Sequence, residues 1–173
     1  MTAQMIPAYN ADGRLGPVEK LEVHRRGLRH PAISVFVRAG DEILLQQRAF
    51  GKYHTPGLWA NTCCTHPHWG EDMRACALRR LQEELGITGL VLSPAGEIEY
   101  RADVGAGLTE HEVVQIFTAE ATRDLPLALN PDEVASIRWM TPEALREAIR
   151  ITPEAFTPWL RIYMDQQFAH IFS

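Results

Sequence analysis

The stretch from Glu71 to Gly86 limits the possible fold more than any other feature of the chain. Its apolar residues recur at helical intervals, at Ala77, Leu78, Leu81 and Leu85. Acidic side chains favour the positive end of a helix dipole, and glycine favours the left-handed conformation that ends a helix. We therefore predict a helix that carries Glu71 and Asp72 in its first turn and ends at Gly86.

The segments on either side of this helix have the shorter period of β-strands. Residues 32–47, AISVFVRAGDEILLQQ, form two apolar, β-branched runs separated by Ala39-Gly40-Asp41, which is typical of a hairpin. Alternating polar and apolar residues at 97–101, 113–120 and 136–140 predict further strands.

The C-terminal third of the chain predicts two more helices. Thr141-Pro142-Glu143 is typical of the start of a short helix. The spacing from Phe156 to Phe168 predicts one last helix. The order of elements indicates an α/β (α+β) fold in which a mixed β-sheet is sandwiched between helices. At 173 residues and 46% hydrophobic content, the chain fits a single domain over 1–173.

Composition excludes several classes of function. A net charge of -5 does not favour nucleic acid, which requires a basic face. Residues 1–14 contain no apolar run after a basic segment, and no run of about 18 apolar residues occurs in the sequence, so we expect no membrane partner. Cys63 and Cys64 are neighbours within an odd set of three cysteines, which indicates reduced thiols and a cytoplasmic location.

The predicted helix has the spacing of a known motif. Thr65, five residues, Glu71, seven residues and then RRLQEELGI resemble the Nudix box, in which carboxylates hold a divalent metal for diphosphate cleavage. Thr65 stands where the box has glycine, and Arg80 where it has glutamate. Arg80 and Glu84 are four residues apart and share a helix face, so that face offers a diphosphate a cation and a carboxylate for Mg²⁺. Solvated ion pairs are the plainer interpretation.

A second group of candidate ligands lies outside the helix. Glu110 and Glu112 precede the run VVQIF and, in a strand, point to the same face as its buried residues. Two unpaired carboxylates are unfavourable there, and a metal would remove that cost. His24, His30 and His66 each fall near a loop or strand edge, and imidazole with carboxylate suits Mn²⁺, Zn²⁺ or Mg²⁺.

Five segments together resemble the type I isopentenyl-diphosphate isomerases, which are Nudix-fold enzymes that interconvert isopentenyl and dimethylallyl diphosphate. The segments are VEKLEVH, QQRAFGKYHTPGLWANTCCTHP, RRLQEELG, EYRADVGAGLTEHEV and FTPW. The resemblance covers nearly the whole chain. That family has a degenerate Nudix box with arginine at the position of Arg80. The departure fits an enzyme that must bind a diphosphate without hydrolysing it.

The resemblance implies a role for each matching residue. Cys64 is the catalytic thiol, and Glu112 is the second acid-base group, with the Tyr100 hydroxyl beside it. Metal ligation is implied for His24, His30, His66, Glu110 and Glu112. Diphosphate binding is implied for Lys20, Arg48, Lys52 and Arg80, with Glu84 holding a substrate-bridging Mg²⁺. Residues 1–30 then form an N-terminal extension that contributes metal and diphosphate ligands.

The reaction itself needs two acid-base groups, because one proton is added to an alkene carbon and another is removed. The intermediate resembles a carbocation, which an aromatic face stabilises, and Trp159 is the candidate. Tyr100 and Trp159 could instead be core aromatics. The alternative functions are a Nudix hydrolase of a diphosphate and a non-catalytic binding protein. We expect a monomer or weak homodimer.

Overall fold

The computed structural model describes residues 3–172, and it begins with an element pair that sequence periodicity does not reveal. Strands β1 (Met5–Tyr9) and β2 (Leu15–Glu19) form a separate antiparallel hairpin. The short helix α1 (Lys20–Arg26) follows directly, and the Glu19 carboxylate caps it by accepting from the backbone N–H groups of Leu21 and Glu22. Residues 1–2 of the predicted extension lie outside the described part.

The remaining strands build one mixed sheet, as predicted. They are β3 (Arg29–Ala39), β4 (Glu42–Arg48), β5 (Trp59–Ala60), β6 (Cys63–Thr65), β7 (Ser93–Gly105), β8 (Leu108–Glu120) and β9 (Val134–Met140). The order is β5-β4-β3-β8-β7, with β6 on β3 and β9 on β4. The β3–β8 pair is parallel and the other pairs are antiparallel.

The predicted hairpin at 32–47 separates soon after its turn. Only Arg38 with Ile43 and Ala39 with Glu42 are paired between β3 and β4. Beyond these residues β3 pairs with β6, while β4 pairs with β5 and β9. The sheet is therefore open between β3 and β4, and strand β6 with its two cysteines lies in that opening.

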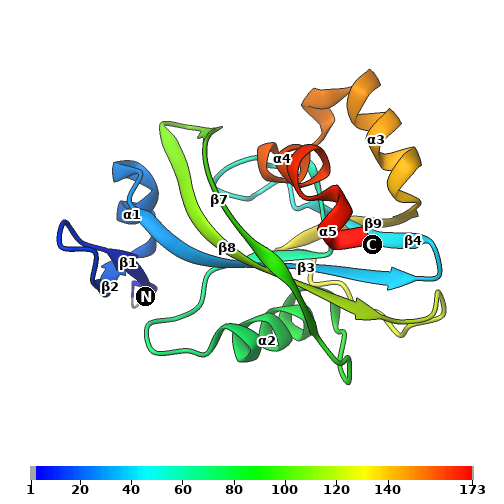
Figure 1. Ribbon diagram of the computed structural model, residues 1–173, viewed down its shortest axis with the longest axis horizontal. Coiled ribbons are helices and arrows are strands. Elements are labelled where there is room, and N and C mark those ends of the chain that lie inside the picture. The colour runs from blue at the N-terminus through cyan, green and yellow to red at the C-terminus, as the bar shows by residue number, and fades with distance from the viewer. Residues whose placement is uncertain (1–2, 173) are drawn as a thin grey trace.

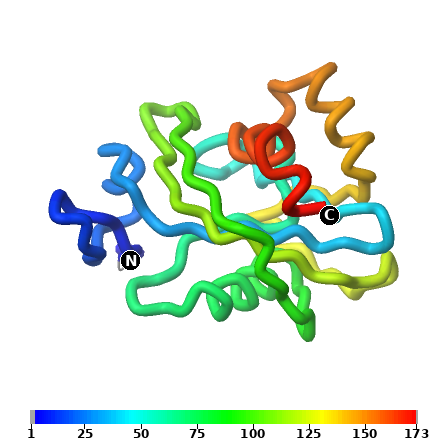
Figure 2. The backbone as a smooth tube through the Cα atoms, in the orientation of Figure 1, coloured from blue at the N-terminus to red at the C-terminus, as the bar shows by residue number. Residues whose placement is uncertain are grey.

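Helices cover both faces of the sheet (Figure 1). On one face lies α2 (Met73–Leu85), which packs its buried residues against β3 and against Phe117 of β8. On the other face lie α3 (Pro142–Ile151), the 3-10 turn Pro153–Ala155, α4 (Pro158–Gln166) and α5 (Phe168–Phe172). Figure 2 shows the N-terminal hairpin at one end of the molecule, well away from the C-terminal helices. None of the helices described is long and apolar enough to cross a membrane.

Two helix boundaries differ from the prediction. Helix α2 begins at Met73, because Asp72 has extended backbone and its carboxylate caps the helix at the N–H of Ala75. Glu71 therefore precedes the helix and does not belong to its first turn. The predicted last helix is two helices, since Gln167 leaves the helical conformation and separates α4 from α5.

The end of α2 is joined to a distant segment. Gly86 has a φ of 67°, and the carbonyl oxygens of Glu84 and Leu85 accept from the backbone N–H groups of Asn130 and Ala128. A Cβ atom at Gly86 would lie 2.7 Å from Cβ and 2.8 Å from N of Ala128. Glycine is therefore required here both for the backbone conformation and for the close approach.

We expect Gly86→Ala to lower the free energy of unfolding by roughly 2–4 kcal/mol, from left-handed strain and steric overlap together. Urea denaturation of the two proteins measures this. Gly89→Ala is the matched control, because Gly89 also has a positive φ but has no atom within 4 Å of the added Cβ. Equal losses in the two variants would show that the contact with Ala128 is unimportant.

Candidate active site

One buried cluster gathers most of the predicted metal ligands. His24 lies in α1, which corrects its expected place near a loop or strand edge, while His30 lies in β3 and Glu110 in β8. His66 follows β6. One ligand atom from each of these four residues lies within 4.8 Å of all the others. Parallel pairing of β3 with β8 produces this convergence, because it places His30 beside Glu112, two residues from Glu110 on the same face.

The hydrogen bonds of two histidines show what this cluster requires. Nδ1 of His24 donates to the carbonyl oxygen of Lys20, and Nδ1 of His30 donates to that of Leu28, each at 2.7 Å. A carbonyl oxygen only accepts, so in the neutral ring each Nε2 keeps a lone pair. Nε2 of His24 lies 3.1 Å from Oε1 of Glu110, which also only accepts. Either a proton on Nε2 or a metal cation between the two groups removes this repulsion.

The pKa directions agree with this need for positive charge. Burial lowers the pKa of His30, but its contacts with Glu110 and Glu112 outweigh burial and raise that pKa to about 10. Burial raises the pKa of Glu110, yet hydrogen bonds from the surrounding histidines hold it well below its ordinary value. Nε2 of His30 and Oε2 of Glu110 have no hydrogen-bond partner among the residues described. A divalent cation fits this donor set.

Glu112 lies at the edge of the cluster. Its Oε2 lies 2.6 Å from Nε2 of His66 and 3.3 Å from Nε2 of His30. The hydroxyl of Tyr100 donates to Oε1, as the antiparallel register of β7 with β8 allows. Burial raises the pKa of Glu112, and the contacts with His30 and His66 lower it overall.

Cys64 projects into the same pocket from β6. Nδ2 of Asn61 donates to the carbonyl oxygens of Val35 and Cys63, which leaves its Oδ1 facing the Cys64 thiol at 2.8 Å. The thiol therefore donates to Asn61, and Ser34 Oγ lies 3.3 Å from the same sulfur. Burial raises the pKa of Cys64 to about 12, although Ser34 and Asn61 oppose the shift.

Cys63 points to the opposite face of β6. Its thiol donates to Oε2 of Glu84 at 3.2 Å, and the cysteines described are all free. Cys76 is buried on α2. The two neighbouring cysteines therefore have different surroundings: the Cys63 thiol contacts Glu84, and of the cysteines only Cys64 lines the pocket.

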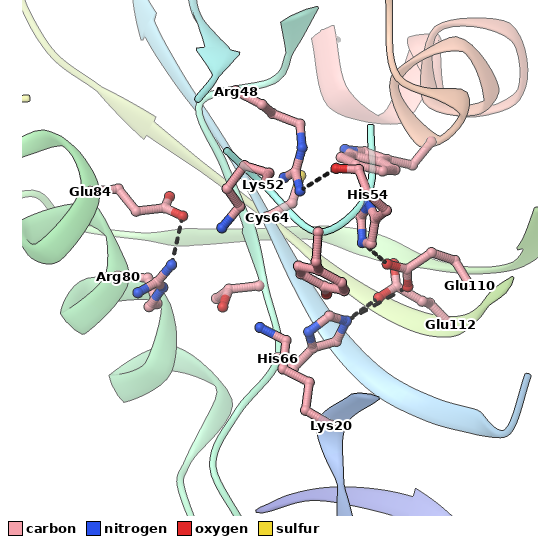
Figure 3. Close-up of a pocket in the computed structure, with 13 residues that line it drawn as sticks. Lys20, Arg48, Lys52, His54, Cys64, His66, Arg80, Glu84, Glu110 and Glu112 are labelled. Atoms are coloured by element: carbon pink, nitrogen blue, oxygen red, sulfur yellow. Dashed lines mark hydrogen bonds and ion pairs between the residues drawn. The ribbon is translucent and has the colours of Figure 1, made fainter. Parts of the chain in front are cut away.

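Four basic side chains line the pocket from other elements: Lys20, Arg48, Lys52 and Arg80. Burial, together with the nearby charges of Lys52 and Arg80, lowers the pKa of Lys20 to about 8. Such mutual repulsion between buried cations is relieved by a bound anion. Figure 3 shows Arg80 and Glu84 on one side of the pocket and Glu110 and Glu112 on the other.

Carboxylates form ion pairs with two of these basic side chains. Arg80 contacts Oε1 of Glu84 at 2.9 Å, which confirms that the two share a face of α2. Glu133 contacts Lys52 at 2.5 Å and Arg80 at 3.4 Å. Glu84 is buried and also accepts from Nε2 of Gln46 at 3.2 Å.

Trp159 closes the pocket from α4. Its ring is buried, and the guanidinium of Arg48 lies 5.2 Å from the ring centroid. One cation therefore already uses a face of this indole. Trp59 is half-buried, and the guanidinium of Arg138 lies 4.9 Å from the centroid of its ring.

Sequence patterns missed several residues of the pocket and its walls: Ser34, His54, Asn61, Glu133 and Tyr163. The sequence does mark Ser34 as unusual, since it is a polar residue inside the apolar run AISVFV. Its hydroxyl lies 2.8 Å from that of Tyr163. His54, Asn61 and Glu133 lie in irregular segments, where neither helical nor strand spacing applies.

Comparison with known proteins places the chain in a family. A family model described as NUDIX domain matches residues 28–160. A protein of Cereibacter sphaeroides (strain ATCC 17025 / ATH 2.4.3) named isopentenyl-diphosphate Delta-isomerase is 63% identical over 170 residues, which cover 98% of this chain and 96% of that one. The protein of the same name from Rhodobacter capsulatus is 60% identical over 172 residues, 99% of this chain and 97% of the relative.

Solved structures agree on the fold. DR0079 from Deinococcus radiodurans superposes with a TM-score of 0.77 at 15% identity, over 95% of this chain and 99% of that one. A MutT NUDIX hydrolase from Burkholderia pseudomallei gives 0.62 at 22% identity, over 80% and 97%. Sequence identity this low shows only the fold, whereas the relatives above are similar over almost their full length. The chain is a Nudix-fold protein and belongs to the isopentenyl-diphosphate Delta-isomerase family.

Proposed function

We propose that this protein interconverts isopentenyl diphosphate and dimethylallyl diphosphate by adding a proton at one end of the allylic unit and removing one at the other. The observation that carries the proposal is one pocket lined by the Cys64 thiol, the Glu112 carboxylate and four basic side chains. A hydrolase has no use for the thiol. The high identity to relatives named isopentenyl-diphosphate Delta-isomerase supports the same conclusion.

The basic side chains anchor the diphosphate. Arg48 and Arg80 offer forked donors to phosphate oxygens, and Lys20 and Lys52 add point charges. Glu84 would hold a Mg²⁺ that bridges to the substrate, because Mg²⁺ is usually bound by one or two carboxylates together with substrate phosphates. The mutual repulsion of these cations in the free protein supports an anionic ligand.

His24, His30, His66, Glu110 and Glu112 would hold a second cation. The lone pairs directed at carboxylate oxygens support this set, and the share of nitrogen ligands favours Mn²⁺ or Zn²⁺ over Mg²⁺. When bound, the metal supplies positive charge that neutralises the two carboxylates and makes a neighbouring proton easier to donate.

Cys64 and Glu112 serve as the two proton-transfer groups. They belong to β6 and β8, which pair with β3 on its two sides, so an allylic unit between them is reached from two directions. The Tyr100 hydroxyl steadies Glu112 by its hydrogen bond. The Trp159 ring borders the pocket and offers an aromatic wall to the carbocation-like intermediate, without a nucleophile to trap it.

We also propose a cytoplasmic location. The free cysteines support a reducing compartment, since disulfides form and persist in oxidising ones.

A labelling experiment tests the function. The protein is incubated with isopentenyl diphosphate and Mg²⁺ plus Mn²⁺ in D₂O, and the substrate is followed by NMR. We expect dimethylallyl diphosphate that carries deuterium in its methyl group. Release of inorganic phosphate or diphosphate without isomerisation would favour a hydrolase and overturn the proposal.

Glu133 gives a prediction about substrate binding. Its carboxylate contacts Lys52 and Arg80, so it competes with the diphosphate for these cations. We expect Glu133→Gln to tighten inorganic diphosphate binding by roughly two- to fivefold, because a partly exposed ion pair contributes up to about 1 kcal/mol. Titration calorimetry in Mg²⁺ measures this. Glu147→Gln, which removes an exposed pair with Arg150 on α3, is the control. Weaker binding in Glu133→Gln would instead indicate that Glu133 helps to hold Mg²⁺.

A further inference from the structure

A fourth buried imidazole lies against the histidine and glutamate cluster. His54 belongs to the irregular segment between β4 and β5, and its side chain is 3% exposed. Its Nε2 lies 3.0 Å from Oε1 of Glu110, the same oxygen that Nε2 of His24 approaches at 3.1 Å. The four residues whose ligand atoms all lie within 4.8 Å of one another do not include it. Figure 3 shows its ring directed at Glu110.

The partner of Nδ1 distinguishes His54 from His24 and His30. In those two residues Nδ1 faces a carbonyl oxygen, so the Nε2 lone pair is directed into the cluster. Nδ1 of His54 lies 2.8 Å from the hydroxyl oxygen of Thr55, and a hydroxyl is able to donate. When Thr55 donates to Nδ1, the neutral ring carries its hydrogen on Nε2. That N–H then points at Glu110.

The backbone at Thr55 is strained in a way that holds this contact. Its φ is 45°, in the left-handed region that a β-branched residue rarely adopts. Neighbouring residues keep the backbone in this conformation. Arg48 donates to the carbonyl oxygen of His54 at 3.2 Å, and the His54 ring packs edge-on against the rings of Tyr53 and Trp159. Strain of this kind is concentrated at functional sites.

We propose that His54 is a positioning residue for the metal centre: its Nε2–H donates to Oε1 of Glu110 and orients that carboxylate toward the cation, while the Thr55 hydroxyl fixes the tautomer. The inference rests on the proposed metal site. Hydrogen bonds to a ligating carboxylate reduce its freedom to turn away from the metal, and their loss weakens metal affinity by about 10–100-fold.

Mn²⁺ binding tests this without reference to activity. The free ion is titrated by its electron paramagnetic resonance signal against wild type, His54→Phe and His54→Gln. We expect His54→Phe to bind about 10–100-fold more weakly. His54→Gln retains an N–H donor of similar reach and should recover most of the loss. His68→Gln, which changes an exposed histidine outside the pocket, should match wild type.

Thr55 supplies a second pair of variants in case His54→Phe folds poorly. Thr55→Val keeps the β-branched shape but removes the hydroxyl, and Thr55→Ser keeps the hydroxyl. We expect weaker Mn²⁺ binding in Thr55→Val and affinity closer to wild type in Thr55→Ser. Equal affinities in the two variants would contradict the role of the hydroxyl in setting the tautomer.

Counting nitrogen ligands separates positioning from direct ligation. Electron-nuclear double resonance of bound Mn²⁺ should show the same nitrogen couplings in wild type and His54→Gln. Loss of one coupling would make His54 a ligand and overturn the proposal, as would unchanged affinity in His54→Phe. Wild-type protein that binds none of Mn²⁺, Zn²⁺ or Mg²⁺ would overturn the metal site itself. Normal wild-type binding with unaffected variants would overturn only the role of His54.

Discussion

Cys64→Ala is expected to lower the rate of isomerisation by about a thousand-fold or more, within the range that a positioned acid-base group contributes. The thiol is held by Asn61 and Ser34 and lines the pocket together with Glu112. Removing the sulfur leaves the diphosphate contacts in place but removes one of the two proton-transfer groups. The measurement is steady-state turnover of isopentenyl diphosphate beside titration calorimetry with inorganic diphosphate, whose affinity should be unchanged.

Cys76→Ala is the matched control for this variant. Cys76 is also buried, but it lies on α2 within the apolar core and outside the pocket. We expect it to lose some stability and to keep its turnover. Cys64→Ser should resemble Cys64→Ala, because a hydroxyl is a much weaker acid than a thiol. Turnover that survives in both Cys64 variants would remove the thiol from the reaction.

Local spacing was enough to predict much of the fold. The helical period of α2 and the alternation in β7 and β8 arise because one face of each element is more buried than the other, and the sequence shows both periods directly. Strands β3 and β4 are buried on both faces, and their continuous apolar runs were the signal instead. The same argument placed Glu110 and Glu112 on one buried face of β8, as observed. Short elements gave no such pattern. Helix α1 has seven residues and β1 and β2 have five each, too few for periodicity to stand out.

The types of residue in the candidate site could be predicted from the sequence, but which of these residues contact one another could not. His30 meets Glu112 only because β3 and β8 pair in parallel, and that choice depends on contacts about 80 residues apart in sequence. His54 had no signal, since it lies in an irregular segment whose conformation depends on Thr55 and Arg48. Asn61 is likewise held by a hydrogen bond to the backbone carbonyl oxygen of Val35 in β3. The order of side chains in the sequence does not reveal such a bond.

Removal of divalent metal is expected to abolish turnover and to lower the melting temperature by roughly 5–10 °C. A ligand that binds only the folded state at a hundred times its Kd adds about 2.7 kcal/mol, and 1 kcal/mol shifts Tm by about 2–4 °C in a chain of this size. The physical reason is that histidine lone pairs and carboxylate oxygens face one another in the buried cluster, and a bound cation removes their repulsion. Differential scanning fluorimetry of chelator-treated protein, with and without added Mn²⁺, measures the shift.

Neighbouring residues of β8 supply the control for metal removal. Glu110→Gln should lose the rise in Tm on adding Mn²⁺, because the substitution removes the negative charge of a carboxylate in the cluster. His111→Ala should keep that rise, since His111 is the adjacent residue but points to the other face of β8, where it contacts Glu99. A rise that persists in Glu110→Gln and is lost in His111→Ala would place the cation on the wrong face of the strand. Because the two variants differ by one position along one strand, the comparison separates the metal site from any general effect of disturbing β8.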